Sequence, residues 1–294
     1  MRARTAPRAS TFKRVEEQPT TRGFRPSWTT SLRIGDLVAC ADFGRASLPG
    51  ADIPILRDVL KLSPTERRQL LARAPLFRGI DSSRLDNLVP ATRVESFGAQ
   101  KNLFRKGDRG RQLYVVARGR LKALTTSDEG DEVVFGIMGP GEVIGEIGIL
   151  GDTERTLTVR TLEPCDLLVL DGRDFLSLVR TEPDLCLELL QLLGKRIRDQ
   201  IQMFEDVKFL KLPYRLARKL DNLAEIYGEP CDGGIRIDLK LSQEEWGDTV
   251  GATREAVNKQ LRSWVDEGLI RIDHGYIVLC DPERIKALAE NFPL

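Results

Sequence analysis

Beyond residue 62 the pattern of apolar and polar residues indicates short β segments in the middle of the chain and a helical spacing after them. A first helix is predicted at Ser63, where Pro64 and Glu66 complete an N-terminal capping signal, and a second short helix follows Asp81. From about Val94 the pattern indicates short β segments. The candidate strands are 94–97, 113–116, 121–125, 133–137, 156–161 and 165–170.

Glycines separate these β segments at breaks where a turn needs a positive φ angle. They are Gly107, Gly119, Gly130, Gly139 and Gly141. Many short strands at this spacing predict a small barrel or sandwich.

A long helical pattern runs from Pro183 to about Leu210. One apolar stripe comprises Leu189, Leu193, Ile197, Ile201 and Phe204, and a neighbouring face adds Leu185, Leu192, Met203 and Val207. Two apolar faces predict two contacts, one with the chain's own barrel and one with a second copy. An ordinary amphipathic helix on one core accounts for fewer positions, so we expect a dimerisation helix.

Pro213 either interrupts this helix or starts a new one in its first turn. Beyond it we expect a helix over 214–226 and a β segment over 235–239. Two short helices follow, and then a hairpin with strands at 269–272 and 276–279.

The two short helices have the signals of a helix-turn-helix. Ser242 can cap the first with Glu245 as its capping-box partner, Gly251 ends it, and Thr253 can cap the second. Helical spacing directs one set of residues inward: Val257, Leu261, Trp264 and Val265. The candidate DNA contacts are Ser242, Thr253, Arg254, Glu255, Asn258, Lys259 and Arg262.

The exposed face of the second helix has the chemistry that reads a major groove. Arginine can donate two bonds to guanine, glutamate can accept from cytosine, and lysine and arginine can reach phosphates. Any surface helix carries charges, but the capped frame and the following β wing favour DNA binding. The charge balance adds no support, since residues 214–294 contain eleven Lys+Arg against fifteen Asp+Glu. We therefore expect weak non-specific binding.

Residue usage argues against several other classes of protein. The five cysteines are scattered without a CxxC pair and His274 is the one histidine, which disfavours a disulfide framework, a metal or haem site and a catalytic set. No enzyme activity is expected, and reduced thiols in a cytoplasm are the simplest interpretation. No apolar stretch reaches the length that spans a bilayer, so no membrane contact is expected.

Residues 1–62 are rich in Arg, Pro, Ser and Thr and predict a disordered extension, with a basic DNA-contacting arm as the alternative.

A second constellation lies within 141–159. A glycine-rich turn offers backbone N–H groups to an anion. Glu146 could accept from a ribose hydroxyl, Arg155 could neutralise a phosphate, and Thr156 could add a hydroxyl donor. On these residues alone, a surface ion pair between Glu146 and Arg155 is an equal alternative.

With these motifs in order, the chain resembles the Crp/Fnr family of transcription regulators over about 71–288. Gly145, Glu146, Arg155 and Thr156 match the family's phosphate cassette, in which Ile147 fills the Ile/Leu position. The stretch Thr253-Arg254-Glu255 and Lys259 resembles the family's recognition helix. The resemblance implies that Glu146 holds a ribose 2′-hydroxyl and Arg155 a cyclic phosphate, with cAMP or cGMP as the effector.

Two departures concern the base of such a nucleotide. Where cAMP-activated members have a Thr-Ser pair, this chain has Gln200 and Ile201. Gln200 can donate and accept with a different reach, whereas the Ile201 side chain can do neither. We expect weak discrimination or weak binding of cAMP, or an effector that is neither nucleotide.

The expected fold class is α+β: an N-terminal antiparallel β-roll sensor domain, a long dimerisation helix and a C-terminal winged helix-turn-helix. The expected domains are 1–62, 63–182, 183–211 and 212–294. We expect a homodimer on a palindromic double-stranded DNA operator, with half-sites about 34 Å apart and RNA polymerase as a further partner. An effector would reorient the long helix and the segment 208–213. The alternatives are a regulator without a nucleotide ligand and a nucleotide-binding module that acts through protein contacts.

Overall fold

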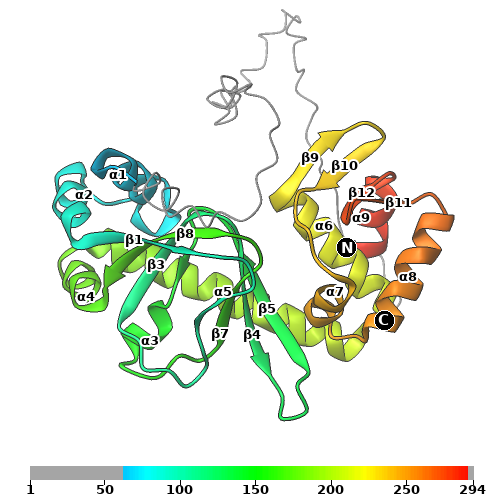
Figure 1. Cartoon of the computed structure of the whole chain (residues 1–294), viewed down its shortest axis with the longest axis horizontal. Coiled ribbons are helices and arrows are strands. Elements are labelled where there is room, and N and C mark those ends of the chain that lie inside the picture. The colour runs from blue at the N-terminus through cyan, green and yellow to red at the C-terminus, as the bar shows by residue number, and fades with distance from the viewer. Residues whose placement is uncertain (1–61, 291–294) are drawn as a thin grey trace, which may run out of the picture. The chain divides into compact units, whose positions relative to one another are not determined.

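The computed structural model describes residues 62–290 (Figure 1). The predicted extension over 1–62 lies outside the described residues, apart from Leu62. The described chain begins with α1 (Pro64–Arg73), which has the predicted capping box between Ser63 and Glu66. A 3-10 turn, η3 (Pro75–Phe77), leads to α2 (Ser82–Leu88), which is capped by Asp81 as predicted, and to η4 (Val89–Ala91).

Two four-stranded antiparallel sheets form the β-roll, with the strand orders β1-β8-β3-β6 and β2-β7-β4-β5 (Figure 1). Each of the six predicted strands is confirmed within two residues, whereas β2 and β6 were not predicted because three and two residues are too short to show a period. The strands are β1 (Thr92–Phe97), β2 (Asn102–Phe104), β3 (Gln112–Arg118), β4 (Leu121–Thr126), β5 (Glu132–Met138), β6 (Val143–Ile144), β7 (Thr158–Thr161) and β8 (Cys165–Asp171).

Four of the five predicted turn glycines have a positive φ angle: Gly107, Gly119, Gly130 and Gly141. The prediction for Gly139 is wrong, because its φ is not positive. A Cβ at residue 139 would lie 3.2 Å from the Tyr227 hydroxyl, so a close contact favours glycine there.

Three helices complete the sensor half: α3 (Glu146–Leu150), α4 (Gly172–Thr181) and α5 (Pro183–Phe209). Helix α5 has 27 residues and occupies almost the whole predicted range. Its first turns pack with Phe77, Phe175 and Leu168 in the sensor core through Leu185 and Leu189. Helix α4 was not predicted, although Asp171 caps it by accepting from the Arg173 N–H.

The C-terminal half has a four-stranded sheet of order β11-β12-β10-β9 and helices around it. Pro213 lies in the first turn of α6, so it starts a new helix. Val265 was predicted to pack inward, but it is exposed, because it lies at the edge of the apolar stripe of α8. The elements are α6 (Leu212–Tyr227), β9 (Gly228–Cys231), β10 (Gly234–Ile237), α7 (Gln243–Val250), α8 (Arg254–Asp266), β11 (Ile270–Asp273), β12 (Tyr276–Leu279) and α9 (Pro282–Glu290).

Candidate functional site

A cavity of about 730 Å³ lies between the β-roll and α5. Strands β4 and β5, helix α3, the segment 155–159 and one face of α5 line it, mostly with apolar side chains. The six predicted effector contacts all line this cavity: Gly145, Glu146, Ile147, Arg155, Thr156 and Gln200.

Arg155 is almost fully buried at one wall of the cavity. Its Nη1 donates to the Gly145 carbonyl at 2.8 Å and its Nη2 to the Gln112 carbonyl at 2.7 Å. The guanidinium carbon lies 4.2 Å from the centroid of the Phe104 ring, within the range of a cation–π contact. Burial lowers the pKa of Arg155, and the buried Nε has no hydrogen-bond partner among residues 62–290. A buried cation held by neutral carbonyls can be stabilised further by an anion.

Glu146 is fully buried, with 0% of its surface exposed. Its Oε1 pairs with Arg196 of α5, whereas its Oε2 has no partner within the described chain. The alternative of a surface ion pair with Arg155 is therefore wrong, because the carboxylate is buried and its ion-pair partner is on another element. The free Oε2 can accept a hydrogen bond from a hydroxyl group.

Helix α5 contributes polar groups that the sequence analysis did not single out. Arg196 lies one helical turn before Gln200, and this four-residue spacing is the signal that could have identified it. Gln200 donates from Nε2 to the Phe135 carbonyl at 3.3 Å, which leaves its Oε1 as an acceptor. Glu142 also lines the cavity, and burial raises its pKa.

The helix-turn-helix has the predicted geometry. The Ser242 and Thr253 hydroxyls accept from the N–H groups of Glu245 and Ala256, so both side chains cap their helices. Gly251 ends α7 in the left-handed region, with φ of 63°. A Cβ on Gly247 would lie 2.5 Å from the Ala252 carbonyl oxygen, so glycine allows the two helices to meet closely.

Helix α8 carries the five predicted DNA contacts that follow Thr253. Arg254, Glu255, Lys259 and Arg262 are exposed on this helix, and Asn258 is half-buried. The Asn258 Oδ1 accepts from Gln243 of α7 at 3.2 Å. Val257, Leu261 and Trp264 hold the opposite face in the core, as predicted.

The predicted dimerisation residues divide into two groups. Leu189 is 3% exposed in the single chain and packs in the sensor core, and Leu193 packs partly against the same cluster. Side chains that their own domain already covers offer less surface to a partner, and the role of these two residues in a dimer stays a prediction. Ile197, Ile201 and Phe204 are exposed.

Two family models match the chain: the cyclic nucleotide-binding domain over residues 94–182 and the Crp-like helix-turn-helix domain over residues 214–288. A "CRP-like cAMP-activated global transcriptional regulator" of Mycobacterium tuberculosis is 30% identical over 217 residues, which are 74% of this chain and 97% of that protein. The chain belongs to the Crp/Fnr family of transcription regulators.

Other members agree with this assignment. The "Cyclic AMP receptor protein" of Thermus thermophilus is 27% identical over 216 residues, which are 74% of this chain and 97% of that protein. The solved structure of the c-di-GMP responsive global regulator of Xanthomonas campestris is 25% identical, with a TM-score of 0.59 over 68% of this chain and 99% of that chain.

Family membership confirms the predicted fold class, an α+β chain with a β-roll sensor and a winged helix-turn-helix. This member is a DNA-binding transcription regulator under effector control, and its relatives are regulators rather than enzymes. Within 62–290, no helix combines the length and the apolar content needed to span a bilayer.

Proposed function

We propose that two copies of this chain bind a palindromic operator, and that a small phosphate-bearing effector in the cavity sets their DNA affinity. The observation that carries this proposal is that α5 has two different faces. One face of α5 lines the cavity through Leu192, Arg196 and Gln200. The other face is exposed and apolar, so a single helix would contact both the effector and a second copy.

The exposed face of α5 follows the spacing of a coiled coil. Leu187, Leu190, Gly194, Ile197, Ile201 and Phe204 succeed one another at steps of three and four residues. We name these six residues the α5 seam. Its five apolar side chains are all exposed in the single chain, and Gly194 would let two helices approach closely. A second copy with its own seam would cover this surface.

The effector that fits best is a cyclic nucleotide. Arg155 and the N–H groups of the glycine-rich turn would hold its phosphate, and Thr156 would add a hydroxyl donor. Glu146 would accept from a ribose hydroxyl through Oε2. The names of relatives include cAMP and c-di-GMP. Isothermal titration with cAMP, cGMP and c-di-GMP would test which nucleotide binds. Gln200 and Ile201 stand where a base would be read, so weak discrimination of cAMP is expected.

Regulation in this proposal needs no catalysis. The two α8 helices would enter successive major grooves, with half-sites about 34 Å apart, and RNA polymerase would be a partner at the promoter. The acidic balance of residues 214–294 favours one other candidate, in which this half contacts proteins instead of DNA.

A selection from a randomised palindromic DNA library distinguishes the two candidates. Wild-type protein should select a palindrome, and Arg254→Ala should lose about 1–3 kcal/mol of specific binding and relax one operator position. Arg284→Ala is the matched control, because Arg284 is exposed in the same domain but lies on α9. Unchanged operator selection by Arg254→Ala would remove Arg254 from base reading, and no selected sequence at all would favour protein contacts.

A further inference from the structure

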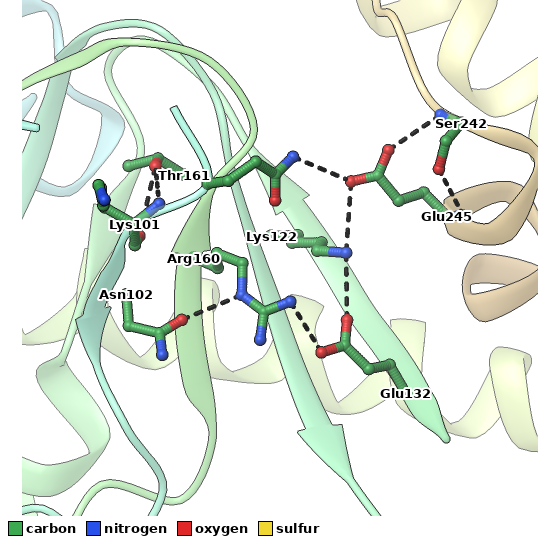
Figure 2. A network of polar contacts seen from close by, with 9 residues as sticks. Lys101, Asn102, Lys122, Glu132, Arg160, Thr161, Ser242 and Glu245 are labelled. Atoms are coloured by element: carbon green, nitrogen blue, oxygen red, sulfur yellow. Dashed lines mark hydrogen bonds and ion pairs between the residues drawn. The ribbon is translucent and has the colours of Figure 1, made fainter. Parts of the chain in front are cut away.

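A buried lysine connects the sensor sheet to the helix-turn-helix (Figure 2). Lys122 lies on β4 and is only 3% exposed. Its Nζ is 3.2 Å from Glu132 of β5 and 3.4 Å from Glu245 of α7. Two carboxylates from opposite halves of the chain therefore share one buried cation.

Neighbouring polar groups on the sheet extend this contact. Arg160 of β7 pairs with Glu132 at 2.8 Å and donates to Asn102 of β2 at 3.0 Å. Gln100 donates to Glu245 at 3.4 Å. Figure 2 shows Lys122 between Glu132 and Glu245, with Arg160 on the far side of Glu132 and Ser242 beside Glu245.

Glu245 performs two tasks with its two oxygens. Oε2 accepts from the Ser242 N–H at 2.9 Å and completes the capping box of α7, whereas Oε1 faces Lys122 and Gln100. The first turn of α7 is thus bonded to the sensor sheet through Glu245, the residue that completes its capping box.

The charges of this network balance when all of its members are together. Lys122 and Arg160 supply two cations, and Glu132 and Glu245 supply two carboxylates. Without Glu245, Lys122 and Arg160 would be left with Glu132 as their directly paired carboxylate, and buried charges are costly unless they are paired.

A second contact lies just before the same strand, two residues ahead of Lys122. Arg120 precedes β4 and pairs with Asp238 at 3.1 Å and with Glu163 at 3.0 Å. Its guanidinium carbon lies 5.1 Å from the centroid of the Tyr227 ring. Ile137 and Leu162 of the sensor half also pack against the core of the C-terminal half.

We propose that the face of the sheet around Lys122 is a docking site for α7 of the same chain, and that the Lys122–Glu245 pair holds α7 there. Adjacent residues on a strand point to opposite faces. Ala123 accordingly lines the effector cavity while Lys122 faces α7. Strand β5 lines the cavity through 135–138 and carries Glu132 at its other end. This part of the inference rests on the proposed effector site. If an effector in the cavity displaces β4 and β5, the Lys122–Glu245 pair would pass that displacement to the helix-turn-helix.

The test is amide hydrogen exchange on the full-length protein without effector or DNA, so it does not depend on the proposed function. Lys122→Met and Glu245→Gln should each raise exchange in α7 and β5 by about tenfold or more, while exchange in β8 stays unchanged. Glu245→Gln keeps a capping-box residue, because glutamine serves at this position as well as glutamate. Glu66→Gln is the matched control, since Glu66 completes the capping box of α1 and its hydrogen bonds within the described chain are to Ser63.

The two variants should not be additive. Once Glu245→Gln has removed the carboxylate, Lys122→Met should add much less to the exchange of α7 than it does alone. Any of three results would overturn the docking site. Exchange in α7 could stay unchanged in Glu245→Gln, or it could rise as much in Glu66→Gln as in Glu245→Gln. The effects of Lys122→Met and Glu245→Gln on α7 could also be fully additive.

The link from the cavity has a test of its own. Ala123→Leu enlarges a side chain that lines the cavity on β4. It should change exchange in α7 by at least about threefold, because packed interiors transmit added volume to their neighbours. If exchange changes in β4 and β5 but not in α7, the contact at Lys122 would hold α7 in place without transmitting changes from the cavity. That result would contradict the connection between the cavity and α7.

Discussion

At the scale of single residues, Arg155 has the most specific chemistry in the cavity. It is buried, it has two carbonyl acceptors, and no carboxylate among residues 62–290 is bonded to it. A phosphate would replace neutral acceptors with an anion, which adds the attraction of opposite charges and a bidentate geometry to the hydrogen bonds of the guanidinium. Arg155→Ala should therefore cost on the order of 3 kcal/mol or more of cyclic-nucleotide binding free energy.

Isothermal titration with cAMP and cGMP measures this loss, and circular dichroism checks the fold. Arg93→Ala is a matched control, because Arg93 is an exposed arginine of the same sensor half that pairs with Glu95. Tight nucleotide binding that survives Arg155→Ala would show that the phosphate is held elsewhere.

Asp248 provides a pH-dependent prediction. The pKa of Asp248 is raised to about 6, chiefly by burial and also by Glu132, Glu244 and Glu245, against the opposing effect of Lys122. The folded protein thus binds a proton more tightly at Asp248 than the unfolded chain does. By linkage, the contribution of this group to stability increases as the pH falls through 6 and is lost as the pH rises.

Asp248→Asn removes the ionisation, so the variant should be more stable than wild type at pH 8 and the difference should shrink at pH 5. Thermal unfolding at the two pH values measures the difference. A difference of the same size at both values would show that the Asp248 carboxylate is not destabilised in the folded protein.

The sequence was sufficient to place the cavity residues but not their partners. The spacing of Glu146, Arg155 and Thr156 after a glycine-rich turn brought all three to one wall. The carbonyls that bind Arg155 belong to residues 112 and 145, and backbone acceptors leave no trace in side-chain patterns. The pairing of Glu146 with Arg196 joins residues 50 positions apart, which a periodicity argument does not reach.

At the scale of elements, capping signals and periodicity predicted the helices that carry them. Ser63, Ser242 and Thr253 each cap a helix as predicted. Strand β9 was not predicted, because Gly228–Cys231 contains a proline and a glycine and is paired with one neighbour only, β10. The stripe on α5 was identified correctly as apolar, but which of its members face the chain's own core depends on the tertiary packing of α4 and the β-roll.

The α5 seam leads to a prediction for this element. Ile197→Glu should give monomers at micromolar concentration, because two seams would bring their glutamates together at the centre of the contact. Analytical ultracentrifugation measures the mass. Ile226→Glu is the matched control, since Ile226 is 57% exposed on α6 and Ile197 is 61% exposed on α5. A dimer that persists in Ile197→Glu would place the interface on another surface.

The same variant should lose operator binding, because a single half-site has too little contact area. Leu193→Glu is a poorer test of the interface, since Leu193 packs partly against the sensor core and its substitution would destabilise the fold.

At the scale of the whole molecule, cavity and recognition helix are connected by two routes. Helix α5 leads from the cavity to the α5 seam, and strands β4 and β5 lead from the cavity to α7. The first route would set the distance between two copies and the second the placement of α7 and α8 in each copy. An effector can shift DNA affinity only by as much as its own affinity differs between these arrangements.

The charge distribution of the whole chain determines how DNA binding should depend on salt. Residues 214–294 contain fifteen acidic and eleven basic residues, and the basic side chains of α8 that face outward are Arg254, Lys259 and Arg262. Each phosphate neutralised contributes about 0.9 to the slope of log K against log salt concentration, so the slope should be well below about 10 in magnitude. Lys259→Ala and Arg262→Ala should each reduce it by about one per subunit and weaken binding equally for all sequences. Titrations of an operator duplex between low and physiological salt measure the slope. A slope near 10, or one unchanged by both variants, would mean that phosphate contacts come chiefly from outside α8.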